Sequence, residues 1–228
     1  METILQLDCS TETAQVSLSV QGRLMGSKEN RKMTDHASWL QVAIKDTLEE
    51  AGIPIRNLDA VAVVAGPGSY TGIRVGMASA KGLCYALDIP MITLNSLVVL
   101  AHAAARNNIK PAVHFLCPML DARRMEVFTA VYTPLLEEMR PPSALVLTDD
   151  AYADLLVENR ILFLGSGSLK WKAFTRHSNA LFADISCGPE DLVALATNKF
   201  RGKDFTSVAY AEPVYLKAFY STQKPKPA

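Results

Sequence analysis

The order of predicted secondary structure is repeated along this chain. Each half shows three closely spaced strand patterns, then a helix, a buried strand, a glycine-containing loop and a further helix. Asp8, at the end of the first strand, matches Asp121, so the copies begin about 113 residues apart in a chain of 228 residues. Such a repeat constrains the whole fold, because each copy is expected to form the same unit. We therefore predict a duplicated α/β protein with two similar lobes, each containing a mixed sheet and flanking helices.

The first half begins with an antiparallel meander, which short connections between alternating apolar segments predict. The continuous apolar run from Ala60 to Ala65 is typical of a strand buried on both faces. The predicted elements are strands 4–8, 14–20 and 23–29, a helix capped by Asp35 that stops at Gly52, a strand 60–65, a helix ending near Leu87, a strand 91–94 and a helix 96–105.

The second half shows the same order. Its predicted elements are strands 113–120, 125–132 and 144–147, a helix capped by Thr148 or Asp149 that runs to Val157, a strand 161–164, the loop 165–167, and helices near Lys170 and Asp191. We assign residues 1–106 to an N-terminal lobe and residues 107–220 to a C-terminal lobe. The remaining residues 221–228, rich in lysine and proline, are expected to form a disordered tail.

The charge balance argues against a dedicated surface for nucleic acid. Lys and Arg number 23 and Asp and Glu also 23, so the formal net charge is zero, whereas nucleic-acid binders usually carry a basic excess. A local basic patch is still compatible with this balance. No segment has the roughly 20 continuous apolar residues of a membrane helix, and four cysteines without C-x-x-C spacing fit a reducing cytosol. We expect a cytoplasmic protein that does not contact a membrane.

Two carboxylates at strand ends form the first candidate site. Asp8 ends the first strand and is followed by Cys9-Ser10-Thr11, and Asp121 occupies the matching place in the second half. Two such groups facing one cleft would hold a hydrated Mg²⁺ beside a nucleotide, as a phosphotransferase requires. The alternative is that each carboxylate bonds backbone amides in its own turn.

The loop from Gly66 to Gly72 lies between a buried strand and a helix, where backbone amides and the helix dipole can cradle an anion. It is incomplete as a phosphate loop, because it contains neither G-x-x-x-x-G-K-[ST] nor G-x-G-x-x-G in register. The alternative is a tight turn that lets the helix approach the sheet closely. The residues predicted to lie near a nucleotide are Asp8, Ser10, Gly66, Gly68 and Asp121.

The helix after this loop carries small residues in two rows. One row contains Gly72, Gly76, Ala80 and Cys84, and the other contains Ala78, Gly82 and Ala86. A glycine inside a helix costs about 1 kcal/mol relative to alanine, so these glycines require an offsetting gain such as close backbone approach. One row would pack on the sheet, and the second indicates a helix of another chain on the outer side. Dense packing within this chain alone is the alternative.

The sequence lacks the patterns of a metallohydrolase or a serine hydrolase. His36, His102, His114 and His177 never lie within four residues of one another, so no H-x-x-x-H pair is present. No G-x-S-x-G occurs either. We therefore assign no catalytic residue and no metal ligand to this chain.

Several segments together resemble the TsaB (YeaZ) family. They are the opening I-L-x-L-D-x-S-T, the central GPGSYTGIRVGMASAKGL from Gly66 to Leu83, Ile89-Pro90, the stretch DARRMEVF from Asp121 to Phe128, and the closing PVYLK from Pro213 to Lys217. The resemblance covers nearly the whole chain and is most specific in the central segment. It implies a duplicated actin-like, RNase H-like fold, in agreement with the repeat.

The resemblance also implies a function in forming threonylcarbamoyladenosine beside the anticodon of tRNAs that read codons starting with A. TsaB-like proteins are non-catalytic relatives of the TsaD-type transferase, pair with it, and are joined by the ATPase TsaE. The implied role is a scaffold that activates TsaD and holds no cofactor itself, with ATP or ADP at the complex interface. We expect tRNA to be held only through the complex, and a symmetric homodimer when the partner is absent.

By this resemblance, helices 35–51 and 71–87 would pack against the equivalent TsaD pair as a four-helix bundle. The residues predicted at this interface are His36, Trp39, Leu40, Ala43, Arg74, Gly76, Ala80 and Gly82. An alternative from another class is an ATP-dependent small-molecule kinase on the same fold, with Asp8 and Asp121 around Mg²⁺. The short chain argues against it, since two minimal lobes leave little room for substrate-binding insertions.

Overall fold

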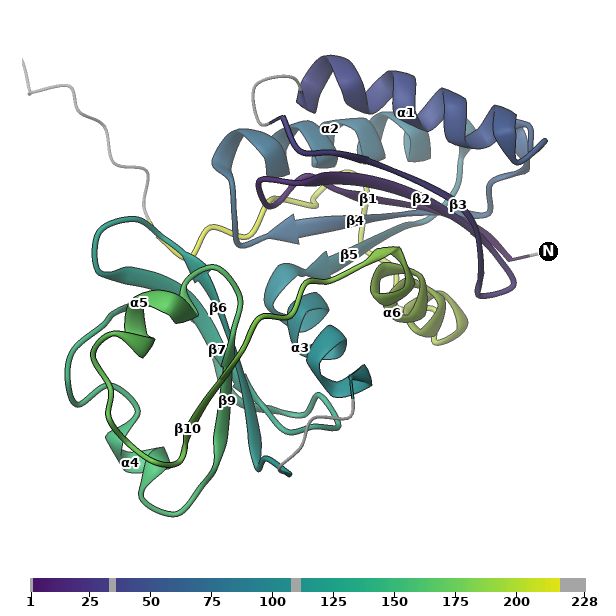
Figure 1. The fold of residues 1–228 in the computed structure, drawn as a ribbon. Helices are drawn as coiled ribbons and strands as arrows, with labels where there is room; N and C mark the ends of the chain where they lie inside the picture. Colours follow the sequence, from purple (N-terminus) through teal and green to yellow (C-terminus); the bar gives the residue numbers. More distant parts are fainter. Residues whose placement is uncertain (1, 33–35, 108–111, 218–228) are drawn as a thin grey trace, which may run out of the picture.

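The chain folds around two five-stranded mixed sheets, one in each half of the sequence (Figure 1). The computed structural model describes residues 2–32, 36–107 and 112–217. The first sheet has the order β3-β2-β1-β4-β5, in which β1 pairs antiparallel with β2 and parallel with β4. Its strands are β1 (Thr3–Asp8), β2 (Ala14–Val20), β3 (Arg23–Asn30), β4 (Ala60–Gly66) and β5 (Met91–Asn95).

The second sheet repeats this topology. Its order is β10-β9-β6-β7-β8, and β6 pairs antiparallel with β7 and parallel with β9, as β1 does with β2 and β4. Its strands are β6 (Phe115–Asp121), β7 (Glu126–Tyr132), β8 (Glu138–Val146), β9 (Ile161–Leu164) and β10 (Ala180–Ala183). The predicted duplicated actin-like α/β fold is therefore confirmed.

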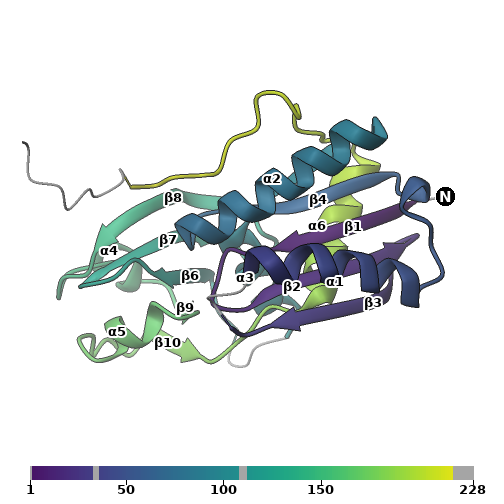
Figure 2. The same ribbon diagram turned by 90° about the horizontal axis from the view of Figure 1, so that it is seen from above.

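Helices cover the two sheets in layers (Figures 1 and 2). One pair, α1 and α2, lies side by side on one face of the first sheet, while α3 lies between the sheets and α4 and α5 cover the far face of the second. The helices are α1 (His36–Glu50), the short 3-10 helix η2 (Ile55–Asn57), α2 (Tyr70–Leu87), α3 (Ser96–Arg106), α4 (Ala153–Leu156), α5 (Ser168–Lys172) and α6 (Pro189–Arg201).

The strand pattern explains the position of the core. In β1, Leu5 and Leu7 contact the side chains of α1 and α2, whereas Ile4 packs on the opposite face with α3 and α6. All seven residues of β4 are buried, as expected for a strand covered on both sides. Because side chains alternate along each strand, one sheet thus contributes to two separate apolar layers, one on each face.

The two halves exchange their last helices. The C-terminal helix α6 packs on β1, β2, β3 and β5 of the first sheet, and α3, which ends the first half, packs on β6 and β7 of the second as well as on β4 and β5 of the first. The segment after α6 also returns to the first sheet, where Thr206 N donates to Met91 O at 2.8 Å and Val214 N donates to Ala65 O at 2.8 Å. A division at residues 106/107 thus separates the two sheets, but α6 and the segment after it lie with the first lobe.

A buried carboxylate joins the exchanged helices. Asp191 at the start of α6 has no exposed surface. Its Oδ1 lies 2.8 Å from His102 Nδ1 and accepts from Arg106 Nε at 3.0 Å, and its Oδ2 accepts from Arg106 Nη2 at 3.1 Å. The Gly188 amide donates to Oδ2 at 2.9 Å. Because His102 and Arg106 belong to α3, this network fixes α3 against α6.

Some predicted boundaries are wrong. Strand β8 begins at Glu138, well before the predicted 144–147, and β10 was not predicted at all. The N-cap of α4 is Tyr152, at a φ of 63°, and not Thr148 or Asp149. The helix begins later than predicted and is a single turn of 4 residues. The predicted cap Asp35 and the predicted tail 221–228 lie outside the described residues.

All four cysteines are free thiols. Burial raises the pKa of the Cys84 and Cys117 thiols to about 11, so both remain protonated at neutral pH and pack as small apolar groups. Within the described part of the chain, no helix combines the length and the apolar character needed to cross a membrane.

Candidate functional site

The ends of β1 and β6 form matching turns. Asp8 Oδ1 accepts a hydrogen bond from Ser10 N at 2.8 Å, and Asp121 Oδ1 accepts one from Arg123 N at 2.6 Å. Each carboxylate thus bonds an amide two residues further on, which is the turn-forming arrangement typical of aspartate. Both carboxylates therefore have the local role in their own turns that we gave as the alternative to a Mg²⁺ site.

Asp121 has a further partner in α5. Lys170 Nζ donates to Asp121 Oδ1 at 2.6 Å and to the carbonyl oxygen of Arg124 at 2.7 Å. Burial raises the pKa of the Asp121 carboxyl, but the bonds from Lys170 and the Arg123 amide more than offset this and hold the pKa below its usual value. Asp121 is therefore an ionised group already paired with a cation of this chain. Among the described residues, no group of three or more His, Cys, Asp or Glu could hold a metal ion.

The loop before α2 packs directly on the end of β1. A Cβ atom added to Gly68 would lie 2.1 Å from Ser10 O, and one added to Gly72 would lie 1.9 Å from Cys9 O. Ser69 N donates to Ser10 O at 2.7 Å, and Ser69 Oγ caps α2 by accepting from Gly72 N at 3.3 Å. The glycines are thus needed for the close approach of the loop and α2 to the residues after β1. The backbone amides of Ser69 and Gly72 already donate hydrogen bonds to oxygen atoms of this chain.

This packing bears on the predicted nucleotide-proximal residues. The carbonyl oxygens of Cys9 and Ser10, just after β1, face the loop where a phosphate would need donors. Gly66, at a φ of 110°, lies against Val214 O, which a Cβ would approach to 3.0 Å. Ser10 Oγ is buried and has no hydrogen-bond partner among the described residues. The geometry explains Gly66 and Gly68 without a ligand, so the nucleotide role of these residues stays a prediction.

One further hollow lies at the edge of the first sheet. Its volume is about 350 Å³, and its walls are mostly apolar. It is lined by Ala65, Thr93, Leu94, Asn95, Val98, Leu195, Asn198, Lys199 and Val214. None of the residues predicted near a nucleotide lines it.

The two rows of small residues on α2 face opposite sides of the helix. Gly72, Gly76, Ala80 and Cys84 are buried against the sheet, where a Cβ at Gly76 would lie 3.4 Å from Val63 Cγ2. The second row, Ala78, Gly82 and Ala86, is exposed, and a Cβ at Gly82 would have no described heavy atom within 4 Å. The outer side of α2 therefore presents bare backbone.

The predicted interface set needs correction. Leu40 and Ala43 of α1, and Gly76 and Ala80 of α2, are buried in the core of this chain and are not available to a partner in this conformation. Their spacing marks the inner face of each helix, because they pack on the first sheet. Trp39 is half-buried against the same core.

The remaining predicted residues are Arg74, Gly82 and His36. Arg74 is exposed and donates from Nη1 to Tyr70 Oη at 2.8 Å, and Gly82 is exposed on the outer row. His36 begins α1, and its side chain lies outside the described residues. Two of the eight predicted residues, Arg74 and Gly82, are thus exposed on the outer surface of α2.

Residues that the sequence did not point to complete this surface. Lys81 Nζ donates to Ala209 O at 3.4 Å and to Ala211 O at 3.0 Å, which holds the C-terminal segment beside α2 (Figure 2). The groove between them has a volume of about 500 Å³. Its lining is Arg74, Met77, Ala78, Lys81, Ala211, Glu212, Pro213 and Tyr215. We call α2 together with residues 207–215 the docking surface.

Two aromatic side chains stand out on the docking surface. Tyr85 of α2 and Tyr210 of the C-terminal segment are each 86% exposed. Tyr85 follows Ala78 and Gly82 at helical spacing, so the sequence contained this signal. Tyr210 carried none, because its place beside α2 depends on the return of the chain after α6.

Comparisons with known proteins agree with this architecture. Residues 30–159 match the family described as TsaD, tRNA N6-adenosine threonylcarbamoyltransferase. The chain is 28% identical to the Escherichia coli (strain K12) tRNA threonylcarbamoyladenosine biosynthesis protein TsaB over 94% of both chains. It is 33% identical to the Bacillus subtilis (strain 168) protein of the same name, over 72% of this chain and 70% of that one.

A solved structure extends the similarity to three dimensions. The structure of YeaZ from Pseudomonas aeruginosa matches 95% of this chain and 100% of its own, with a TM-score of 0.76 and 30% sequence identity. The resemblance therefore includes both lobes.

Proposed function

The chain belongs to the TsaB (YeaZ) family, and we propose that it is a non-catalytic subunit in the formation of threonylcarbamoyladenosine on tRNA. Its proposed partner is a TsaD-type transferase, which would perform the transfer and which this chain would activate. The curated relatives are named as proteins of this biosynthesis, and the match of residues 30–159 to the TsaD family supports a fold shared by the two partners.

The outer face of α2 is the observation that carries the proposal. Glycine costs about 1 kcal/mol inside a helix, and no contact with the described residues offsets that cost at Gly82, where a Cβ would meet no described atom within 4 Å. A partner helix lying on this face would offset it, because small residues shorten the distance at which two helix axes can pack. Tyr85 and Tyr210, both 86% exposed, offer the large aromatic anchors that dominate many interfaces.

The remaining partners follow from the same proposal. A homodimer through the docking surface would be isologous and would compete with the TsaD-type subunit. We further propose that a TsaE-type ATPase joins the complex, that ATP or ADP binds at the complex interface and not in this chain alone, and that the complex works in the cytoplasm.

An ATP-dependent kinase is the weaker candidate. Both predicted Mg²⁺ carboxylates bond their own turns, and Asp121 also pairs with Lys170. Loss of ATP turnover by the isolated chain on Asp8→Ala would favour the kinase. We expect no turnover by the isolated chain.

The direct test is threonylcarbamoyladenosine formation on a substrate tRNA, with the synthase of threonylcarbamoyl-adenylate, TsaD, TsaE and ATP, in the presence and absence of this chain. We expect product only when the chain is present. Undiminished product without the chain would contradict the proposal.

A paired substitution tests the surface itself. Gly82→Leu should abolish association with TsaD and product formation while the variant stays folded. Gly202→Leu is the matched control, because Gly202 is an exposed glycine with a right-handed helical backbone at the end of α6, outside the docking surface. Equal association of both variants would show that the partner binds elsewhere.

A further inference from the structure

A lysine of α2 holds a turn of the C-terminal segment, residues 207–211, which we call the Tyr210 turn. Lys81 Nζ donates to the carbonyl oxygen of Ala209 at 3.4 Å and to that of Ala211 at 3.0 Å. These two residues flank Tyr210 in the sequence. The ammonium group of Lys81 therefore bonds the backbone on both sides of an aromatic residue of the docking surface.

The other contacts of the Tyr210 turn leave the tyrosine on its outer side. Ala211 N donates to Ser207 O at 2.9 Å, which closes the turn. The side chains of Val208 and Ala211 pack on the core beneath α1 and α2, whereas Tyr210 is 86% exposed. One side of the turn is thus fixed to the first lobe, and its aromatic residue is left to a partner.

The position of Lys81 on α2 also brings the turn close to the second exposed tyrosine. Tyr85 follows Lys81 by four residues, and residues at this spacing lie on the same face of a helix. Like Tyr210, it is 86% exposed. In Figure 2 the C-terminal segment runs along the side of α2 that is away from α1. The two tyrosines therefore belong to one stretch of the docking surface, beside the last turns of α2.

We propose that Lys81 is a positioning residue of the docking surface, which holds Tyr210 where a protein partner binds it. This inference rests on the proposed function, which makes the partner a TsaD-type subunit. A segment that is ordered before association avoids the entropy cost of being ordered on binding. Without the bonds from Lys81, only the fraction of molecules with a correctly placed turn can bind, so the apparent affinity falls in proportion to that fraction.

The hydrogen bonds of Lys81 favour this role over a direct contact with the partner. A lysine ammonium group has three donors, and its bonds are stronger than those between neutral groups. Two oxygen atoms of the Tyr210 turn accept bonds from it, and the side chain is half-buried. The alternative is that Lys81 binds a carboxylate of the partner, which predicts a different result when Lys81 and Tyr210 are replaced together.

The test is calorimetric titration of the full-length chain with the TsaD-type subunit. Tyr210→Ala should weaken binding by about tenfold or more, as expected for an aromatic anchor. Lys81→Met keeps the length of the side chain but cannot donate. If about a third to a tenth of its molecules then have a correctly placed turn, binding should weaken by about three- to tenfold. Lys81→Arg retains charged donors and should restore most of the affinity.

The double variant Lys81→Met/Tyr210→Ala separates the two roles. Two residues that act through one contact are not additive, so Lys81→Met should cause no further loss of affinity once Tyr210 has been removed. A direct contact between Lys81 and the partner would instead give a further loss in the double variant.

Hydrogen exchange of the isolated chain measures the turn without a partner. Peptides that cover residues 207–214 should exchange faster in Lys81→Met than in the wild type, because the turn has lost two hydrogen bonds. Peptides from β1 and β4 should exchange at the wild-type rate, which shows that the first lobe remains folded.

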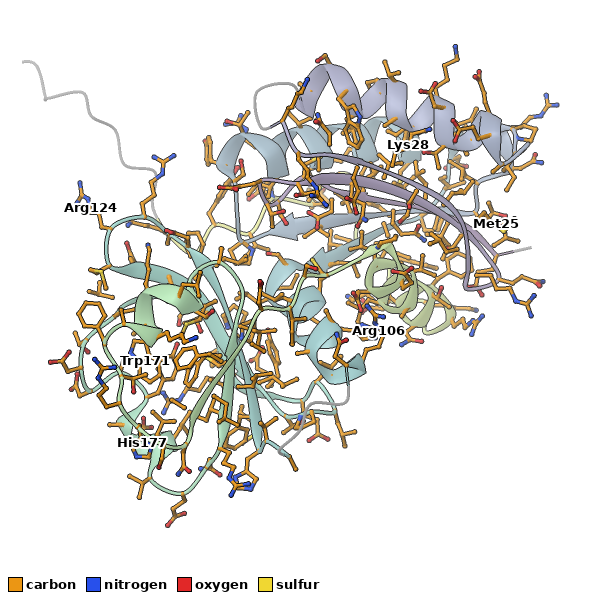
Figure 3. The ribbon with its side chains drawn as sticks, in the orientation of Figure 1. Met25, Lys28, Arg106, Arg124, Trp171 and His177 are labelled. Atoms are coloured by element: carbon orange, nitrogen blue, oxygen red, sulfur yellow. The ribbon has the colours of Figure 1, made fainter. Side chains whose placement is uncertain are left out.

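The matched control is Lys28→Met, at another lysine that ties two elements of the first lobe together. Lys28 Nζ donates to Glu50 Oε1 at 2.7 Å and thereby joins β3 to α1. Lys28 lies on the α1 side of the first lobe (Figure 3), whereas the C-terminal segment lies beside α2. The control should change neither the affinity for TsaD nor the exchange of residues 207–214.

Several results would overturn the inference. These are wild-type affinity of Lys81→Met, unchanged exchange of its Tyr210 turn, an equal loss of affinity in the control, or a further loss in the double variant. Failure of the wild-type chain to associate with TsaD would contradict the proposed function itself. The exchange measurement, made without TsaD, would then still show whether Lys81 holds the turn.

Discussion

The same substitution at two glycines of α2 should change stability in opposite directions. Gly72 and Gly82 both gain helix propensity on replacement by alanine, at most about 1 kcal/mol each. At Gly82 the new methyl group meets no described atom within 4 Å, so Gly82→Ala should stabilise the isolated chain by about 0.5–1 kcal/mol.

At Gly72 the new methyl group would lie 1.9 Å from Cys9 O and 3.1 Å from Cys9 C. These are backbone atoms of the residue that follows β1, so either α2 with its preceding loop or the segment after β1 must move. Overpacking of this kind typically costs about 1–3 kcal/mol, which exceeds the propensity gain. Gly72→Ala should therefore destabilise the chain by about 1–2 kcal/mol, on the combination of these two effects.

Thermal unfolding followed by circular dichroism measures the difference. For a chain of this size, 1 kcal/mol corresponds to about 2–4 °C, so Tm should rise by a few degrees for Gly82→Ala and fall by a few for Gly72→Ala. The scans should be repeated over a range of protein concentrations, because self-association through the docking surface would make Tm concentration-dependent. A Gly72→Ala chain as stable as the wild type would refute the close packing of the loop on β1.

Further predictions concern the α3–α6 network and the docking surface. Asp191→Ala should lower the free energy of unfolding by about 3 kcal/mol. Removing one member of a buried ion pair costs about 3–5 kcal/mol, and the lower end applies here because Arg106 stays partly hydrated. An unchanged urea midpoint would contradict this prediction. Burial raises the pKa of the Asp191 carboxyl, but bonds with His102 and Arg106 more than offset this and hold the pKa below its usual value. The stability from Asp191 should therefore be complete at neutral pH and disappear as the pH falls through that lowered pKa, a dependence that Asp191→Asn should remove in acid titrations. Tyr85→Ala should weaken TsaD binding by about tenfold or more, as expected for an aromatic anchor, and should leave Tm unchanged. Equal affinities of the variant and the wild type in calorimetric titration would contradict this prediction.

The two edge strands of the second sheet were harder to predict from the sequence than the other strands. The buried run of β4 and the alternation of β1 and β2 reflect strands with neighbours on both sides, and their bounds agree closely with the prediction. The early part of β8 contains Pro141 and Pro142, which interrupt a strand pattern but are tolerated at the sheet edge where β8 lies. β10 is the opposite edge, and its four residues are only partly buried, whereas the four residues of β9 are all buried.

The candidate site was predictable in part. Two small-residue rows on α2 could be read from spacing, but glycine and alanine give little hydropathy contrast, so spacing could not say which row faces the sheet. Leu40 and Ala43 were placed outside although their apolar character suits the core, where they lie. The C-terminal part of the docking surface depends on a contact between α2 and residues more than a hundred positions later, as the bonds from Lys81 show.

The exchange of α3 and α6 between the halves has a consequence for synthesis on the ribosome. One face of the first sheet, with Ile4, Ala62 and Ile92, is covered by side chains from α6, which is among the last described elements to be translated. Domains usually fold from the N-terminus as they emerge. Here the first lobe cannot close until residues 189–214 leave the exit tunnel, so the nascent chain carries a half-covered sheet while the second lobe is being made.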